Sequence, residues 1–74
     1  MTNLMDTQTY NKISEVVESL KQMFVTQRQV NVNSKIQELR AIGITFNRVY
    51  TDARCQEWHV LKDGKVIQNV EFTR

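Results

Sequence analysis

The sequence predicts an α+β fold, in which two main helices pack on a small antiparallel three-stranded sheet. Two observations carry this prediction. Apolar residues recur with a helical period of 3.6 in the first part of the chain, and this period changes to the alternation of β-strands after Gly43. A chain of 74 residues is expected to form a single domain, residues 1–74, with a small core.

The first helix is expected at about residues 7–25. Its apolar side chains have the spacing of one helical stripe, and they are Ile13, Val16, Val17, Leu20, Met23 and Phe24. The polar, amide-rich residues 26–33 interrupt this stripe. One short helical turn at 27–30 is compatible with them, and a plain loop is the alternative.

A second helix is expected at residues 34–42. Ser34 and Gln37 fit a capping box, in which each side chain accepts a hydrogen bond from the backbone amide of the other residue. The stripe expected to be buried consists of Ile36, Leu39 and Ile42. Gly43 follows at a position where a left-handed backbone conformation commonly ends a helix.

Three strands are expected after Gly43, and the last two form a hairpin. Asp63-Gly64 is a strong signal for a two-residue type I′ turn between β-rich segments. An unbroken register from this turn predicts the following pairs: Lys62 with Lys65, Leu61 with Val66, Val60 with Ile67, Trp58 with Asn69, and Glu57 with Val70. Neither face of the hairpin is purely polar, which favours partial cover of the second face, for example by a partner chain.

The sequence predicts that the protein is not an enzyme. His59 and Cys55 are the sole residues of their types, whereas a metal site needs several converging ligands. The sequence has no glycine-rich phosphate loop, paired-carboxylate motif or nucleophile elbow. We therefore expect no catalytic residue, no cofactor and no metal ligand.

The cysteine content and the first residues predict a cytoplasmic location in a bacterial or infected host cell. A lone thiol suits a reducing compartment, and the N-terminal residues lack the basic start and apolar run of a signal peptide. No apolar run is long enough to cross a membrane. We expect no contact with a membrane.

Charge and amide side chains favour a contact with DNA. The formal net charge is +2, and the basic excess falls in residues 25–74. A helix in the major groove contacts bases with its first residues, which here are Asn33, Ser34, Lys35 and Gln37. Arg28 is suited to a phosphate contact, and Lys62 and Lys65 would stand at the tip of a protruding arm. An ordinary solvated surface is also compatible with these residues.

The chain also resembles a known DNA-binding family. The motif of this family's recognition helix and following strand is matched by Ser34, Lys35, Ile36, Leu39, Arg40, Gly43 and Ile44. Over residues 26–67 the chain is similar to the winged helix-turn-helix domains common among phage and prophage proteins. It departs from them at residues 26–33, which offer one turn where the family has a full second helix.

The resemblance implies a mode of DNA binding. The 34–42 helix would enter the major groove, and the side chains facing bases would be Ser34, Lys35 and Gln37. Arg40 would contact phosphate or pack against the core. Residues 62–65 would form the wing, which touches the DNA backbone or minor groove.

Two functions remain open from the sequence. The first is a small phage- or prophage-type DNA-binding regulator of transcription or recombination, which contacts double-stranded DNA through the 34–42 helix and the 62–65 wing. The second is a phage-type protein-interaction module, an inhibitor or adaptor of a host protein, which would form a homodimer through its sheet.

Overall fold

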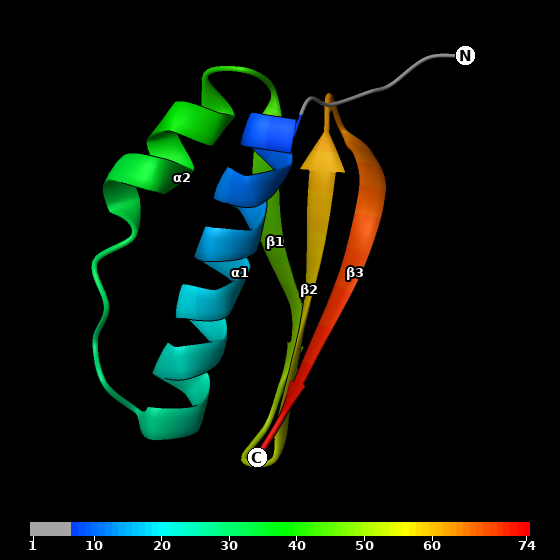
Figure 1. The fold of residues 1–74 in the computed structure, drawn as a ribbon. Coiled ribbons are helices and arrows are strands. Elements are labelled where there is room, and N and C mark those ends of the chain that lie inside the picture. The colour runs from blue at the N-terminus through cyan, green and yellow to red at the C-terminus, as the bar shows by residue number, and fades with distance from the viewer. Residues whose placement is uncertain (1–6) are drawn as a thin grey trace.

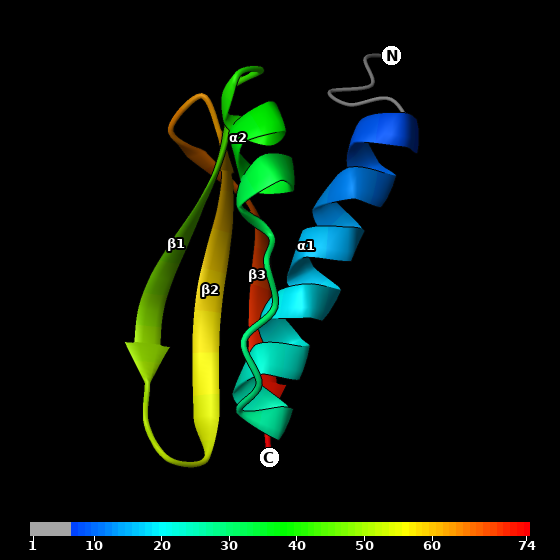
Figure 2. The ribbon, with the colours of Figure 1, turned by 90° about the vertical axis from the view of Figure 1, so that its left-hand side faces the viewer.

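Two helices lie on one side of a three-stranded antiparallel sheet (Figure 1 and Figure 2). The computed structural model describes residues 7–74. In chain order the elements are α1 (Thr7–Thr26), α2 (Asn33–Arg40), β1 (Ile44–Thr51), β2 (Cys55–Lys62) and β3 (Lys65–Thr73). The strands lie in the order β1-β2-β3, and neighbours pair antiparallel. The expected α+β fold, with two helices packed on this sheet, is confirmed.

Helix α1 buries the apolar stripe that predicts it. Its buried side chains are Ile13, Val16, Leu20 and Phe24. The helix continues to Thr26, whose hydroxyl donates a hydrogen bond to the Gln22 carbonyl oxygen at 2.6 Å. Gln27 then takes a positive φ of 59°, which turns the chain out of the helix.

The connection between the two helices is not helical. Residues 27–32 contain no helical turn, so the short turn expected at 27–30 is wrong and the plain-loop alternative is confirmed. Val32 anchors the end of this segment, because its side chain is buried. Figure 1 shows the segment running back alongside α1, so that the two helices run in roughly opposite directions.

Helix α2 begins without the expected capping box. Its first residue is Asn33, and the N-cap position before it is held by Val32, which offers no side-chain hydrogen bond. The Asn31 side-chain oxygen instead accepts a hydrogen bond from the Asn33 amide at 3.1 Å. The capping box of Ser34 and Gln37 is therefore wrong. Burial of Val32 starts the helix earlier and places the serine inside its first turn.

Helix α2 also ends earlier than expected, at Arg40 rather than at residue 42. In the tight turn that follows, the amides of Ile42 and Gly43 donate to carbonyl oxygens three residues back at 3.1 and 3.0 Å. This turn carries the Ile42 side chain outward, where it is 48% exposed, so its expected burial is wrong. Leu39 is fully buried and Ile36 is partly buried, in agreement with the stripe.

The hairpin of β2 and β3 turns where the sequence predicts. Asp63 and Gly64 have positive φ values of 53° and 85°, as a type I′ turn requires. The first two expected pairs are confirmed, and they are Lys62 with Lys65 and Leu61 with Val66. A β-bulge then shifts the register, and the next pairs are Val60 with Gln68, Trp58 with Val70, and Glu57 with Glu71. Three of the expected pairs are therefore wrong: Val60 with Ile67, Trp58 with Asn69, and Glu57 with Val70.

Burial of apolar surface accounts for this bulge. In the unbroken register, Asn69 and Glu71 would share the helix-facing side of the sheet with Trp58. The bulge instead places Val70 and Phe72 on that side, where both are buried. The burial of two apolar side chains in place of two polar ones therefore sets the register.

The core lies between the helices and one face of the sheet. Its buried members from the sheet are Ile44, Val60, Val70 and Phe72. No other part of residues 7–74 covers the opposite face, which we call the open face (Figure 2). By strand alternation and register, the open face carries Asn47, Tyr50, Glu57, His59, Leu61, Val66 and Asn69.

Candidate nucleic-acid interface

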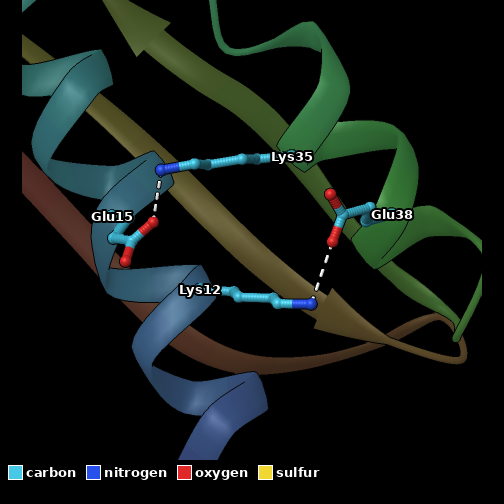
Figure 3. A network of polar contacts seen from close by, with 4 residues as sticks. All are labelled: Lys12, Glu15, Lys35 and Glu38. Atoms are coloured by element: carbon cyan, nitrogen blue, oxygen red, sulfur yellow. Dashed lines mark hydrogen bonds and ion pairs between the residues drawn. The ribbon is translucent and has the colours of Figure 1, made fainter.

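Two ion pairs join α1 to α2 (Figure 3). Lys12 Nζ lies 2.9 Å from Glu38 Oε1. The hydrogen bond from Lys12 lowers the pKa of Glu38 below its ordinary value. The ammonium of Lys35 contacts the carboxylate of Glu15. Lys35, which was expected to face DNA bases, therefore points toward α1.

The other predicted contacts in and before α2 are exposed. They are Arg28, Asn33, Ser34, Gln37 and Arg40. Within residues 7–74, no carboxylate forms an ion pair with either arginine. These side chains are accessible to a ligand, but α2 has only 8 residues on which to arrange them.

The tip of the β2–β3 hairpin packs against the end of α2. Lys62 Nζ donates a hydrogen bond to the Ile42 carbonyl oxygen at 2.7 Å and lies 3.3 Å from Asp63 Oδ2. The Asp63 amide donates to the Gly43 carbonyl oxygen at 2.9 Å. The expected protruding arm is therefore wrong. Lys65, in contrast, is exposed and has no ion pair within the described part of the chain.

The predicted DNA contacts do not form one surface. Arg40, Lys62 and Lys65 belong to the region where α2 ends and the hairpin tip packs, whereas Arg28 lies beyond the end of α1. Because residues 27–32 form no helix, α2 packs on α1 without the intervening helix of a helix-turn-helix. We call the region where α1 meets α2 and the β2–β3 hairpin packs on the end of α2 the lysine end, defined by Lys12, Lys35, Lys62 and Lys65.

At the opposite end of the molecule, the turn between β1 and β2, the end of α1 and the C-terminal residue lie together (Figure 1). Arg74 joins them. Its Nε donates a hydrogen bond to the Phe24 carbonyl oxygen at 2.9 Å, and its Nη1 donates to the Ala53 carbonyl oxygen at 3.0 Å. Its guanidinium carbon lies 4.3 Å from the centre of the Phe24 ring. These partners are neutral, and no carboxylate side chain among residues 7–74 forms an ion pair with Arg74.

Three other arginines belong to segments next to Arg74, and the four together define what we call the arginine end: Arg28, Arg48, Arg54 and Arg74. The Arg54 carbonyl oxygen accepts a hydrogen bond from the Arg74 amide at 2.9 Å. Arg48 and Arg74 line the same groove. Arg28 directly follows Gln27 in the chain. In the orientation of the Gln27 side-chain amide that satisfies its neighbours, its oxygen accepts hydrogen bonds from Nη1 and Nη2 of Arg74, both at 3.3 Å.

Positive charge at the arginine end has no ion-pair partner. Among residues 7–74, no carboxylate side chain forms an ion pair with any of its arginines. The neighbouring Asp52 accepts hydrogen bonds from the Tyr50 hydroxyl at 2.6 Å and from the Cys55 and Arg54 amides at 2.8 and 2.7 Å. These bonds hold the pKa of Asp52 at about 2. Asp52 therefore shapes the turn that presents Arg54.

Sequence reasoning missed Arg48, Arg54 and Arg74. One signal was available: Arg48 and Gln56 occupy helix-facing positions of their strands, in line with the core residues Ile44 and Val60. Polar side chains at positions where alternation predicts apolar ones commonly indicate a functional region. The other arginines are far apart in sequence, so only the fold brings them together.

Cys55 and His59 are the described residues that sequence reasoning weighed as nucleophile, base or metal ligand. Desolvation, followed by the nearby charge of Asp52, raises the pKa of the Cys55 thiol, so this thiol is a weak nucleophile at neutral pH. His59 Nε2 lies 3.8 Å from Glu57 Oε2. Within residues 7–74, no three histidine, cysteine or acidic side chains are grouped as metal ligands. None of the described helices is both long and apolar enough to span a membrane.

Comparisons of the chain with protein-family models, curated proteins and solved structures found no match. The function proposed below therefore rests on the geometry and charge of the described residues.

Proposed function

We propose that this protein binds nucleic acid and that the arginine end makes its phosphate contacts. The observation that carries the proposal is the cluster of Arg28, Arg48, Arg54 and Arg74, which has no ion pair within residues 7–74. The planar guanidinium group binds phosphate oxygens through two parallel hydrogen bonds. A cluster of such groups also attracts a polyanion over a distance comparable to the Debye length.

The arginine end is suited to this role because part of it is held in place before a ligand arrives. Arg74 is fixed by two backbone carbonyl oxygens, and the turn carrying Arg54 is fixed by Asp52. Less side-chain and loop freedom is then lost on binding, which favours affinity.

The lysine end supports the proposal less strongly. Lys12, Lys35 and Lys62 already have carboxylate partners. A phosphate would have to displace these carboxylates, so the net gain from each lysine would be small. Arg40 and Lys65 have no such partner among the described residues and could add weak secondary contacts.

Fluorescence anisotropy of labelled oligonucleotides, duplex and single-stranded, tests this function. Binding should occur at low salt, and the logarithm of the affinity should fall linearly with the logarithm of the salt concentration. Arg54→Ala should weaken binding roughly tenfold, because it removes a charge-assisted hydrogen bond. Lys65→Ala removes the same charge at the lysine end and should change the affinity much less. The absence of binding to either oligonucleotide at low salt would overturn the proposal.

A protein-interaction module is the second candidate, and the open face of the sheet favours it. On this face Val66 is 52% exposed and pairs with the partly buried Leu61, whereas Tyr50 is 50% exposed and pairs with Glu57 further along β2. A partner chain, including a second copy, would bury them. Sedimentation equilibrium at increasing protein concentration tests this candidate. A stable dimer that Val66→Lys dissociates would support it, and a monomer that captures no host protein would exclude it.

A further inference from the structure

A groove opens at the arginine end between the last turns of α1 and the helix-facing side of the sheet. Its volume is about 320 Å³. Its walls include Met23 and Phe24 from α1, Arg48, Gln56 and Trp58 from the sheet, and Arg74 from the end of the chain. This volume lies at the lower limit of small-molecule sites, so the groove has room for one small planar group rather than for a long ligand.

The walls of the groove combine flat apolar surfaces with positive charge. The Trp58 indole N–H donates to Gln56 Oε1 at 2.8 Å. Its hydrogen-bonding capacity is thereby used within the protein, and the partly buried ring is left to interact through its face. Gln56 also donates from Nε2 to Thr51 Oγ1 at 3.2 Å, so this amide is held in place as well. Trp58 is therefore fixed in orientation before any ligand binds.

Two arginine side chains line the same groove, and they differ in how firmly the protein holds them. Arg74 is fixed against the Phe24 ring and two carbonyl oxygens. Arg48 is exposed and has no ion pair within residues 7–74. One charge is thus fixed at the groove, while the other is free to reach a phosphate beside it.

These features together fit a nucleotide whose base is not paired. A nucleobase presents a π-face that stacks on aromatic rings and on guanidinium planes. In a duplex these faces are covered by neighbouring bases, so only an unpaired base can offer one to a concave site. A linear carboxylate or a lipid phosphate would use the arginines but not the flat walls.

We propose that the groove between α1 and the sheet binds one unpaired nucleobase through Trp58, with the adjacent phosphate held by Arg48. This inference rests on the proposed nucleic-acid function and makes it specific for single-stranded rather than duplex nucleic acid. The other arginines then follow the sugar-phosphate backbone on either side of the groove.

The chain contains a single tryptophan, so intrinsic fluorescence reports directly on this groove. The wild-type protein is titrated with three probes of roughly ten nucleotides, a length within the site sizes of single-strand binders. The probes are oligothymidylate, an abasic strand of the same length and charge, and a duplex. Oligothymidylate should quench Trp58 fluorescence. The abasic strand should bind roughly fivefold more weakly or worse, because it lacks base stacking, and should leave the fluorescence unchanged.

Substitutions of Trp58 test whether stacking on its ring contributes to affinity, because anisotropy of a labelled strand does not depend on tryptophan fluorescence. Trp58→Phe keeps a flat aromatic wall, and anisotropy with labelled oligothymidylate should show affinity within about threefold of wild type. Trp58→Leu should lose roughly fivefold or more for oligothymidylate but retain its affinity for the abasic strand. Circular dichroism establishes that each variant is folded. The abasic comparison uses wild-type protein and needs no variant.

The outcomes distinguish this inference from the function on which it rests. Equal affinity for oligothymidylate and the abasic strand, without quenching of Trp58, would overturn the base-binding groove while leaving phosphate binding intact. Tighter binding of the duplex than of oligothymidylate would also overturn it. Failure of all three probes to bind at low salt would overturn the proposed function itself.

Discussion

At the lysine end, the ammonium groups of Lys12, Lys35 and Lys62 meet carboxylates that the same fold provides. At the arginine end, guanidinium groups either contact neutral carbonyl oxygens or have no partner among residues 7–74. Both ends are rich in basic residues, so composition alone does not separate them. The two ends differ in which of their basic side chains form ion pairs with carboxylate side chains.

This difference assigns different roles to the two ends. A compensated charge contributes to the packing of elements, whereas an uncompensated charge is costly to gather and is commonly retained for a ligand. We therefore expect substitutions at the lysine end to change stability with little effect on nucleic-acid affinity. Substitutions of the unpaired arginines should have the opposite effect.

The largest expected change in stability comes from Gly43→Ala. Gly43 has a φ of 91°, and an added Cβ would lie 2.3 Å from Asp63 Oδ1. The variant should lose about 1–3 kcal/mol of unfolding free energy, measured by urea denaturation. Gly64→Ala is the matched control, because Gly64 also has a positive φ but open space around its Cα. Equal losses in the two variants would show that the exposed Asp63 side chain moves aside at little cost and that the positive φ alone sets the loss, which would contradict a larger effect at Gly43.

A smaller loss is expected for Arg74→Ala, the one substitution that should affect both stability and binding. It removes two hydrogen bonds to backbone carbonyl oxygens and the contact with the Phe24 ring. The expected loss of unfolding free energy is about 1–2 kcal/mol. Arg28→Ala, which removes the same charge without these contacts, should leave the thermal midpoint unchanged. An Arg74→Ala variant with the same unfolding free energy as wild type would contradict the contribution of these contacts to stability.

The ion pairs between the helices should contribute less. Lys35→Ala should lower Tm by no more than about 3 °C, because the pair with Glu15 is exposed and its charges are well solvated. Raising the salt concentration should reduce the difference between this variant and wild type. Calorimetry of wild type and of Lys35→Ala at low and high salt measures this difference in Tm. A loss of nucleic-acid affinity as large as that of Arg54→Ala would contradict the assignment of Lys35 to structure.

The smallest expected effect is a loss of stability in acid that depends on the carboxylate of Asp52. Hydrogen bonds hold its pKa at about 2 in the folded chain, below the value of about 3.9 expected when unfolded. A lowered folded pKa contributes stability that is fully present above about pH 4 and is lost as the pH falls toward 2. The difference in stability between wild type and Asp52→Asn should therefore shrink over this window in urea titrations. A difference that stays constant from pH 5 to 2 would show that the carboxylate charge is not involved.

Local patterns in the sequence predict the elements of this fold well, because each is marked by adjacent residues. The stripe of α1 and the Asp63-Gly64 turn are examples, and both are confirmed. The hairpin register could not be predicted in the same way. The burial of Val70 and Phe72 goes with a bulge in the register of β2 and β3, and no local pattern of residues marks this bulge.

The candidate site was harder to predict for a related reason. Of the arginine end, the sequence pointed only to Arg28. Arg48 lies within β1, Arg54 lies in the turn before β2, and Arg74 is the last residue, so they meet only through tertiary packing. The reverse holds for Lys35 and Lys62, which look available in the sequence but are paired in the fold.

The salt dependence of oligonucleotide binding tests the division of roles between the two ends most directly. It is measured for wild type, for Arg48→Ala/Arg54→Ala and for the control Arg40→Ala/Lys65→Ala, which removes the same charge elsewhere. The arginine-end variant should reduce the slope of log affinity against log salt by about 1.4 to 1.8, since each of the two lost phosphate contacts changes it by about 0.7–0.9. The control should change the slope by much less, because Arg40 and Lys65 are expected to make only weak secondary contacts. An unchanged slope for Arg48→Ala/Arg54→Ala, with a reduced slope for the control, would contradict the account.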